Sequence, residues 1–183
     1  MATALLIIDM QDGMAERTAA GRPRANPQAE AHCAALLAEF RARGLPVLHV
    51  LHDDPDPQSP FRRDSALGQP MACARPAPDE PVFWKTGSSA FAGTGLDAEL
   101  RRRGIDRIVL IGAVAAFCVT SSVRAAADLG FQVLLPGDAL IGFDIPAHDG
   151  GRIDAETVLR VTLSLLGADF ARLTTAAELP GLL

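Results

Sequence analysis

Arg-Ile-Val-Leu-Ile-Gly-Ala-Val-Ala-Ala-Phe-Cys-Val-Thr, residues 107–120, joins a strand-like segment to a helix-like one. The apolar, β-branched run from Arg107 to Ile111 is typical of a buried strand, and the small residues after Gly112 permit a tight turn. A helix is predicted over Cys118–Leu129. Because free N–H groups and the helix dipole at a helix start favour a thiolate, Cys118 is a candidate nucleophile. The alternative is an inert core cysteine, since free cysteines are often buried.

Strand-like runs alternate with helical periods along the chain, which is the pattern of an α/β fold with a parallel sheet. The predicted strands are Leu5–Asp9, Pro46–Leu51, Val82–Trp84, Arg107–Ile111, Gln132–Leu135 and Phe170–Thr174. The predicted helices are Pro27–Arg43, Leu96–Arg103, Cys118–Leu129 and Ala155–Leu166, with a final turn at Ala176–Leu179. We expect one three-layer α/β/α domain over residues 1–183, with a six-stranded parallel sheet in the Rossmann-like strand order 3-2-1-4-5-6.

The composition narrows the classes of function. The 183 residues are 49% hydrophobic and 21% charged, with a net charge of −5 and no block of Lys and Arg, so we expect no nucleic-acid partner. The longest apolar run, Ile108–Val119, is too short to span a bilayer, so we expect no membrane role. Three cysteines without metal-ligand spacing indicate neither a disulfide framework nor a zinc site, and a reducing cytoplasm fits best.

Three chemically distinct side chains follow or end predicted strands. Asp9 ends the first strand, Lys85 follows the third, and Cys118 follows the fourth. Ligands bind at the carboxyl ends of strands in open parallel sheets, so these side chains should share one rim. A buried Asp9 needs a cationic partner, and Lys85 would hold both Asp9 and a thiolate in their ionised forms. The alternative is a structural Asp–Lys pair beside an unreactive cysteine.

Three motifs in order resemble those of the isochorismatase-like cysteine hydrolases. They are Leu5–Gln11, Trp84–Phe91 and Gly112–Val119, and the likeness extends over nearly the whole chain. The resemblance implies that Asp9, Lys85 and Cys118 form a catalytic triad. It also implies a cis peptide bond between Ala113 and Val114 and an oxyanion site made by the Val114 and Cys118 backbone N–H groups.

The resemblance also implies a reaction. Asp9 takes the proton of the Cys118 thiol, the sulfur attacks a carbonyl or similar carbon, and ammonia or an amine leaves before water releases the acid. The expected substrate is a small amide, ureide or related carbonyl compound, and the expected assembly is a homo-oligomer. The chemistry needs no cofactor.

One departure from the family concerns metal binding. Members that act on nicotinamide typically carry an Asp-x-His motif with further histidines that hold a divalent metal, whereas this chain has His52-Asp53-Asp54-Pro55. His52 and Asp54 could ligate a metal, but a credible site needs three or four converging ligands. We therefore expect no metal.

Other departures make the predicted pocket more apolar. Met14 stands where many members have phenylalanine, and Ala115 and Ala116 replace polar residues before the cysteine. The candidate substrate-binding residues are Gln11, Met14, Phe61, Trp84, Ser89, Phe91 and Phe117. Each aromatic residue has core packing as its alternative role. The long loop from Asp53 to Pro81 is expected to shape the pocket, and His148 is expected in a solvated loop.

Two other functions remain open at this stage. One is vinyl-ether hydrolysis of an isochorismate-like substrate by acid chemistry from Asp9. Family members without a cysteine favour that reaction, so the presence of Cys118 argues against it. The other is a ligand-binding or scaffold protein that keeps the fold without turnover. An unreactive Cys118 thiol with an ordinary pKa would favour the scaffold.

Overall fold

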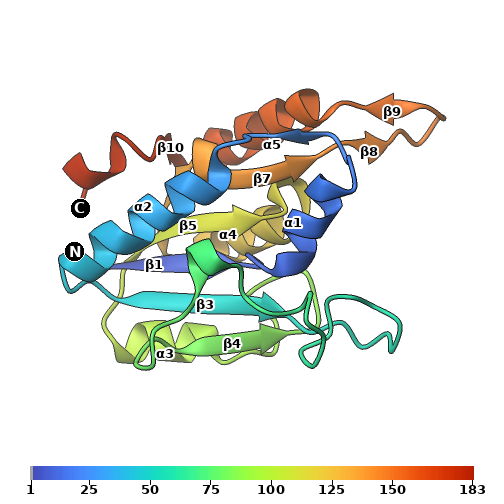
Figure 1. The fold of residues 1–183 in the computed structure, drawn as a ribbon. Helices are drawn as coiled ribbons and strands as arrows, with labels where there is room; N and C mark the ends of the chain where they lie inside the picture. The colour runs from blue at the N-terminus through green and yellow to red at the C-terminus, as the bar shows by residue number, and fades with distance from the viewer. Residues whose placement is uncertain (1) are drawn as a thin grey trace.

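The computed structural model describes residues 2–183 and has a central sheet between two layers of helices (Figure 1). The six predicted strands are all present, with bounds that differ by a few residues. They are β1 (Thr3–Ile8), β3 (Val47–His52), β4 (Val82–Lys85), β5 (Arg107–Ala113), β6 (Gln132–Pro136) and β10 (Arg172–Thr174). Two further strands, β2 (Arg24–Ala25) and β7 (Leu140–Phe143), complete an eight-stranded sheet.

The sheet forks at β5. Residues Arg107–Val109 pair with β6, whereas Gly112 and Ala113 pair with β7. The strand order is therefore β4-β3-β1-β5-β6-β10 on one path and β4-β3-β1-β5-β7-β2 on the other. The predicted order 3-2-1-4-5-6 describes only the first path. The prediction of a six-stranded, wholly parallel sheet is wrong, because β7 and β2 join it and β2 runs antiparallel to β7.

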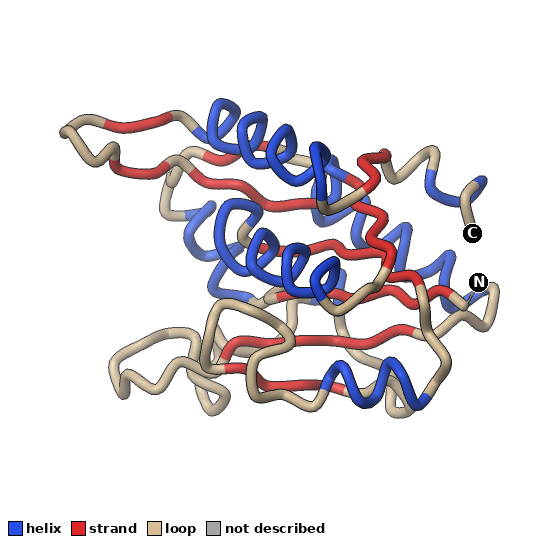
Figure 2. The backbone as a smooth tube through the Cα atoms, turned by 180° about the vertical axis from the view of Figure 1, so that it is seen from behind, coloured by secondary structure: helices blue, strands red, loops and turns tan. Residues whose placement is uncertain are grey.

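Helices cover both faces of the sheet (Figures 1 and 2). One face carries α1 (Asp12–Ala19) and α2 (Ala29–Ala42), and the other carries α3 (Leu96–Arg102), α4 (Thr120–Asp128) and α5 (Ala155–Asp169). Helix α1 was not among the predicted helices. Single turns of 3-10 helix lie at Ala72–Ala74, Gly137–Ala139 and Leu179–Gly181. Within residues 2–183, no helix has both the length and the apolar character needed to cross a bilayer.

Strand β1 is buried on both faces, which is why its sequence is a continuous apolar run. Leu5 and Ile7 pack in the cluster that includes the apolar side of α2, and Leu6 and Ile8 pack in the cluster beneath α3 and α4. Asp9 directly follows this strand and is therefore also buried, with a side chain that is 1% exposed.

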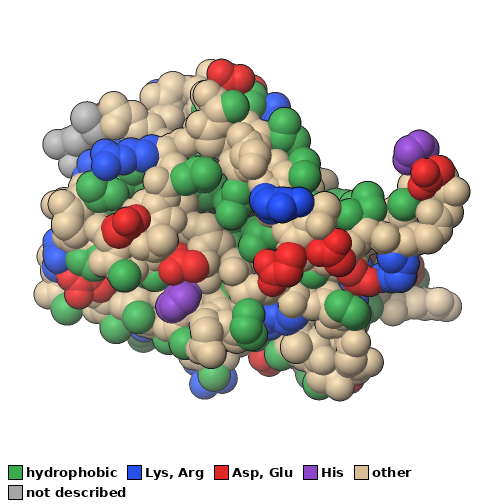
Figure 3. All heavy atoms as spheres, turned by 90° about the horizontal axis from the view of Figure 1, so that it is seen from above, with side chains coloured by type: hydrophobic (Ala, Val, Ile, Leu, Met, Phe, Trp, Pro, Cys, Tyr) green, Lys and Arg blue, Asp and Glu red, His purple; other side chains and the backbone are tan. Residues whose placement is uncertain are grey.

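A two-stranded hairpin projects from the body of the molecule beside α5 (Figures 1 and 3). It consists of β8 (Ile145–Pro146) and β9 (Arg152–Ile153), which pair antiparallel. His148 lies in the turn between them, as the expectation of a solvated loop requires. At the base of the hairpin, the buried Asp144 forms ion pairs with Arg22 and Arg152.

Strands β1 and β5 approach so closely at Gly112 that no side chain fits there. Gly112 has φ +127°, and a Cβ atom would lie 2.0 Å from the carbonyl oxygen of Ile8. We expect Gly112→Ala to lower the free energy of unfolding by about 3 kcal/mol or more, measured by thermal or urea unfolding. Gly44→Ala is the control, because Gly44 has φ +63° but open space around it, so only about 1 kcal/mol is expected. Equal losses in the two variants would contradict the steric explanation.

Candidate active site

Three strand ends bring Asp9, Lys85 and Cys118 together. Asp9 follows β1 with φ 50°, Lys85 is the last residue of β4, and Cys118 lies in a π-helical turn, Ala115–Val119, that follows β5. Strand β3 lies between β1 and β4, and its last residue, His52, is the register partner of Lys85. The rule that parallel strands collect functional groups at their carboxyl ends thus holds for these residues.

The Lys85 ammonium is the centre of the site. Its Nζ lies 2.8 Å from Asp9 Oδ2 and donates to Cys118 Sγ at 3.3 Å and to the Gly87 carbonyl oxygen at 3.2 Å. His52 Nδ1 lies 3.4 Å from the same nitrogen. The Lys85 and Asp9 side chains are 0% and 1% exposed, so this is a buried ion pair. Such a pair is costly to bury unless further hydrogen bonds offset the desolvation, and here Lys85 makes them to Gly87 and Cys118.

Asp9 keeps one carboxylate oxygen free. Within residues 2–183, Oδ1 is buried without a hydrogen-bond partner, whereas Oδ2 is held by Lys85. Burial raises the pKa of Asp9, against the lowering effect of the charge and hydrogen bond of Lys85. A carboxylate with a raised pKa and a free oxygen beside a thiol is suited to accept a proton.

The thiol of Cys118 is protonated in the resting site. Burial and the negative charge of Asp9 raise its pKa to about 11, against the lowering effect of Lys85. This differs from the expectation that the helix start would favour a thiolate. The physical reason is that burial and the Asp9 carboxylate outweigh the ammonium beside the sulfur.

The raised thiol pKa predicts slow alkylation of the resting protein. The iodoacetamide reaction of Cys118 should accelerate about tenfold per pH unit from pH 7 to about pH 10, because only the thiolate reacts. Peptide mass spectrometry would measure labelling at Cys118 separately from Cys33 and Cys73. A labelling rate that is already maximal at pH 7 would contradict the protonated resting state.

The backbone around Cys118 is fixed by short contacts. The Ala113–Val114 peptide bond is cis, as the resemblance implies. The Cys118 carbonyl oxygen accepts a hydrogen bond from Ser122 Oγ at 2.7 Å, and the same Oγ accepts one from the Ala90 N–H at 2.9 Å. The segment after Lys85 is therefore bound to the start of α4, which sets the position of the sulfur relative to the ammonium.

A cavity of about 320 Å³ is lined in part by Cys118. Among the predicted site residues, Asp9, Met14, Phe61, Val114, Phe117 and Cys118 line it. Arg17, Arg22, His52, Asp54 and Phe143 also line it. Of these additional residues, the sequence analysis had considered His52 and Asp54 only as metal ligands. The cavity lining thus combines the aromatic rings of Phe61, Phe117 and Phe143 with two arginines and the nucleophile candidate.

Four predicted substrate-binding residues do not line this cavity. Gln11 holds the long loop instead, because its Nε2 donates to the His52 and Gly68 carbonyl oxygens and its Oε1 accepts from the His52 N–H. Trp84 lies under the Arg63 guanidinium, 4.8 Å from the ring centroid.

The other two lie at the start of the segment that leads to α3. Ser89 Oγ accepts a hydrogen bond from the Phe91 N–H, and Phe91 stacks on Phe131 with 6.0 Å between ring centroids. Both side chains therefore have structural partners in the body of the protein.

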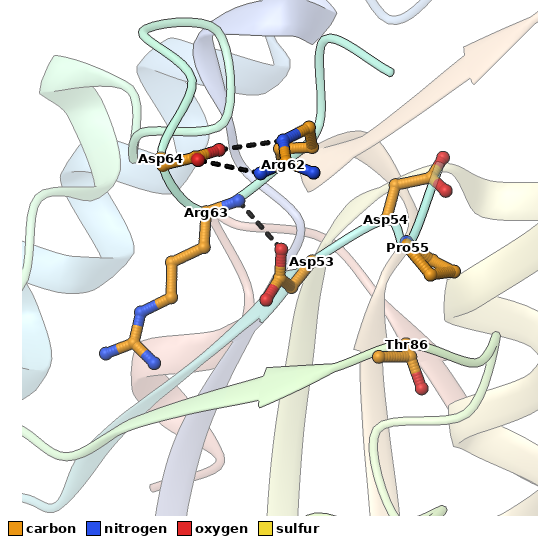
Figure 4. A pocket seen from close by; sticks show the side chains of 7 residues that line it. All are labelled: Asp53, Asp54, Pro55, Arg62, Arg63, Asp64 and Thr86. Atoms are coloured by element: carbon orange, nitrogen blue, oxygen red, sulfur yellow. Dashed lines mark hydrogen bonds and ion pairs between the residues drawn. The ribbon is translucent and has the colours of Figure 1, made fainter. Parts of the chain in front are cut away.

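A larger and more open hollow lies beside the site, at the start of the long loop. Its volume is about 610 Å³, and it is lined by Asp53, Asp54, Pro55, Arg62, Arg63, Asp64 and Thr86 (Figure 4). Arg62 pairs with Asp64, and Asp53 accepts a hydrogen bond from the Arg63 N–H. None of the triad candidates lines this hollow. Its ion pair and its hydrogen bond join residues of the long loop to one another.

The two candidate metal ligands, His52 and Asp54, contact other groups of the protein. His52 turns Nδ1 toward Lys85, and burial and the Lys85 charge lower its pKa, so it is neutral. Asp54 Oδ1 accepts a hydrogen bond from the Asp56 N–H at 3.0 Å. In the part of the chain that the structure describes, no group of three or more His, Cys, Asp and Glu side chains is arranged to hold a metal ion.

Arg17, Arg22 and Phe143 were not among the site residues predicted from the sequence. Arg17 reaches the cavity because α1 places Met14 and Arg17 three residues apart on one helical face. This spacing was the available signal, but Asp12–Ala19 has few apolar residues and was not predicted as a helix. Phe143 ends β7, whose pairing with β5 depends on the tertiary fold.

The chain is similar in sequence to a known protein family and to characterised relatives. A family model described as the isochorismatase domain matches residues 3–163. Streptothricin hydrolase from Streptomyces noursei is 33% identical over 146 residues, which are 79% of this chain and 51% of that relative. N-carbamoylsarcosine amidase from an Arthrobacter species is 39% identical over 71 residues, which are 39% of this chain and 26% of the amidase. The chain thus spans about half of the first relative and a quarter of the second.

Solved structures match over nearly the full length. An isochorismatase-family protein from Chromobacterium violaceum has a TM-score of 0.93 and 37% identity, covering 98% of this chain and 92% of that one. A cysteine hydrolase from Pseudomonas syringae pv. phaseolicola has a TM-score of 0.88 and 25% identity, covering 98% and 91%.

Proposed function

Since this chain belongs to the isochorismatase family of hydrolases, we propose that it is a cysteine hydrolase that cleaves a C–N bond in a small amide, ureide or related carbonyl compound. The observation that carries the proposal is the Lys85 ammonium, which contacts both the Asp9 carboxylate and the Cys118 sulfur in a buried site. The names of two relatives, a hydrolase and an amidase, agree with this chemistry.

The first half of the reaction makes an acyl-enzyme. The free Oδ1 of Asp9 takes the thiol proton while Cys118 Sγ forms a bond to the carbonyl carbon. Negative charge moves from the carboxylate to the sulfur and then to the substrate oxygen, and Lys85 contacts both the carboxylate and the sulfur. On the substrate oxygen, the charge is bound instead by the N–H groups of Val114 and Cys118, which are the proposed oxyanion donors.

Loss of the amine completes the acyl-enzyme, and hydrolysis then releases the acid. The tetrahedral intermediate collapses, the C–N bond breaks, and Asp9 returns its proton to the leaving nitrogen, so that ammonia or an amine departs. Water then gives a proton to Asp9 and attacks the thioester carbon. The C–S bond breaks, and the same proton returns to sulfur to restore the thiol.

The proposal is tested by a panel of small primary amides and ureides. We expect release of ammonia from at least one member. Intact-protein mass spectrometry of a quenched reaction should show one acyl group attached at Cys118. Ammonia release without any adduct at Cys118, even with slowly deacylating amides, would contradict the acyl-enzyme route.

A further inference from the structure

Arg17 is a cation in the cavity without an acidic partner. No carboxylate oxygen of residues 2–183 lies within 4.0 Å of its side-chain nitrogens. Its NH1 lies 3.9 Å from the Met14 sulfur, and its guanidinium lies 4.6 Å from the centroid of the Phe61 ring. Burial and the positive charge of Arg22 lower the pKa of Arg17, which reflects this lack of a counter-charge.

The neighbouring arginine is bound differently. Arg22 Nε lies 3.3 Å from Asp144 Oδ1, and NH2 donates to the Asp144 carbonyl oxygen at 2.9 Å. The second carboxylate oxygen of Asp144 is bound by Arg152. Arg22 therefore has its counter-ion within the protein and packs over Phe143, at 5.0 Å from the ring centroid.

The third charge at the cavity wall, Asp54, does not neutralise Arg17. Its Oδ1 accepts a hydrogen bond from the Asp56 N–H within its own loop. The Asp9 carboxylate is also committed, since it pairs with Lys85. The cavity thus has one positive charge that the protein leaves for a ligand.

We propose that Arg17 binds a carboxylate of the substrate, so that the substrate is a small amide whose other end carries a negative charge. The inference rests on the proposed amide hydrolysis for the reacting end of the molecule. A guanidinium presents a planar pair of N–H donors that match a carboxylate, and partial burial strengthens that ion pair relative to one in open water. The volume of about 320 Å³ suits a substrate of this size.

The apolar side chains near Arg17 also suit this substrate. Phe61 lies under the guanidinium and restricts its motion, so that less conformational freedom is lost when an anion binds. The apolar side chains of Met14 and Phe117 border the same cavity and suit a short methylene chain between the amide and the carboxylate.

Binding is tested on the Cys118→Ala protein, so that turnover does not interfere. The probes are succinamate, glutaramate and adipamate. Each is compared with an uncharged analogue in which a methyl ketone replaces the carboxylate. By isothermal titration calorimetry, at least one acid should bind about 10-fold to 100-fold more tightly than its ketone. Adding Arg17→Gln should remove this preference, and adding Arg17→Lys should keep part of it.

The matched control is Arg124→Gln. Arg124 is also partly buried and lies over an aromatic ring, 4.2 Å from the Phe170 centroid, but it does not line the cavity. The preference for the acid should survive in this variant. Equal affinity for acids and ketones, or a preference that Arg17→Gln leaves unchanged, would overturn the carboxylate site.

Turnover distinguishes this inference from the proposed function. If wild-type protein releases ammonia equally well from acids and ketones, the hydrolase assignment stands and the role of Arg17 is refuted. If the acids bind through Arg17 but no amide of the broader panel is hydrolysed, the anion site stands and the proposed reaction is refuted. With both correct, Arg17→Gln raises KM for the acids about 10-fold or more with little change in kcat.

Discussion

Cys118→Ala is expected to lower kcat/KM by about 10⁴-fold or more, to the background of the assay. Alanine removes the sulfur that forms the acyl-enzyme, and no other thiol or hydroxyl side chain lies beside the Lys85 ammonium among the described contacts. The measurement is steady-state ammonia release from the best amide of the panel, with protein folding checked by circular dichroism.

Cys73→Ala is the matched control for this variant. Cys73 is also a partly buried free cysteine, but it lies in the single 3-10 turn Ala72–Ala74, away from the cavity lining. Its replacement should leave kcat/KM within about twofold. Retained activity in Cys118→Ala, with unchanged stability, would refute a thiol nucleophile and favour acid chemistry from Asp9.

Asp9→Asn is expected to lower kcat by about 10³-fold and also to destabilise the protein by about 3 kcal/mol. Asparagine tolerates the φ of 50° at this position and keeps an oxygen for Lys85, but it cannot accept the thiol proton. The loss of stability arises because the Lys85 ammonium, which is 0% exposed, loses its counter-ion. Urea unfolding and single-turnover kinetics measure the two effects separately.

The two effects of Asp9→Asn are separated by a second substitution. Lys85→Met, added to Asp9→Asn, removes the unpaired buried charge and should recover most of the lost stability while activity stays at background. If Asp9→Asn keeps more than about a tenth of wild-type kcat, Asp9 is not the base, whatever the stability.

The sequence predicted the parts of the fold that are encoded locally. The apolar runs of β1 and β5 and the glycines after the helices are strong signals, so six strands and four helices were found. Strands β2 and β7 were missed because short segments such as Arg24–Ala25 form strands only when a partner is supplied. The fork at β5 depends on that long-range pairing, and no local pattern reports it.

The candidate site was also predicted only in part. Asp9, Lys85 and Cys118 were predicted to meet, because strand direction alone brings their chain positions to one rim. The pKa of Cys118 was not predictable from its place before a helix, because it depends on burial and on the distance to Asp9. The role of Gln11 was likewise not predictable from the sequence. Its position two residues after Asp9 predicts a role at the site, but its partners are backbone groups of His52 and Gly68.

The contacts of Lys85 have a consequence for the timing of catalysis. An ammonium has three protons, yet with the neutral His52 protonated on Nε2 four acceptors surround it: Asp9 Oδ2, Gly87 O, Cys118 Sγ and His52 Nδ1. One acceptor is always left over, so a small rotation about the Cε–Nζ bond reassigns the protons among them. As the sulfur becomes negative, it can gain a full hydrogen bond at the expense of His52. Lys85 can therefore redirect its protons toward the negative sulfur by rotation of its own ammonium group. This adjustment needs no movement of the backbone.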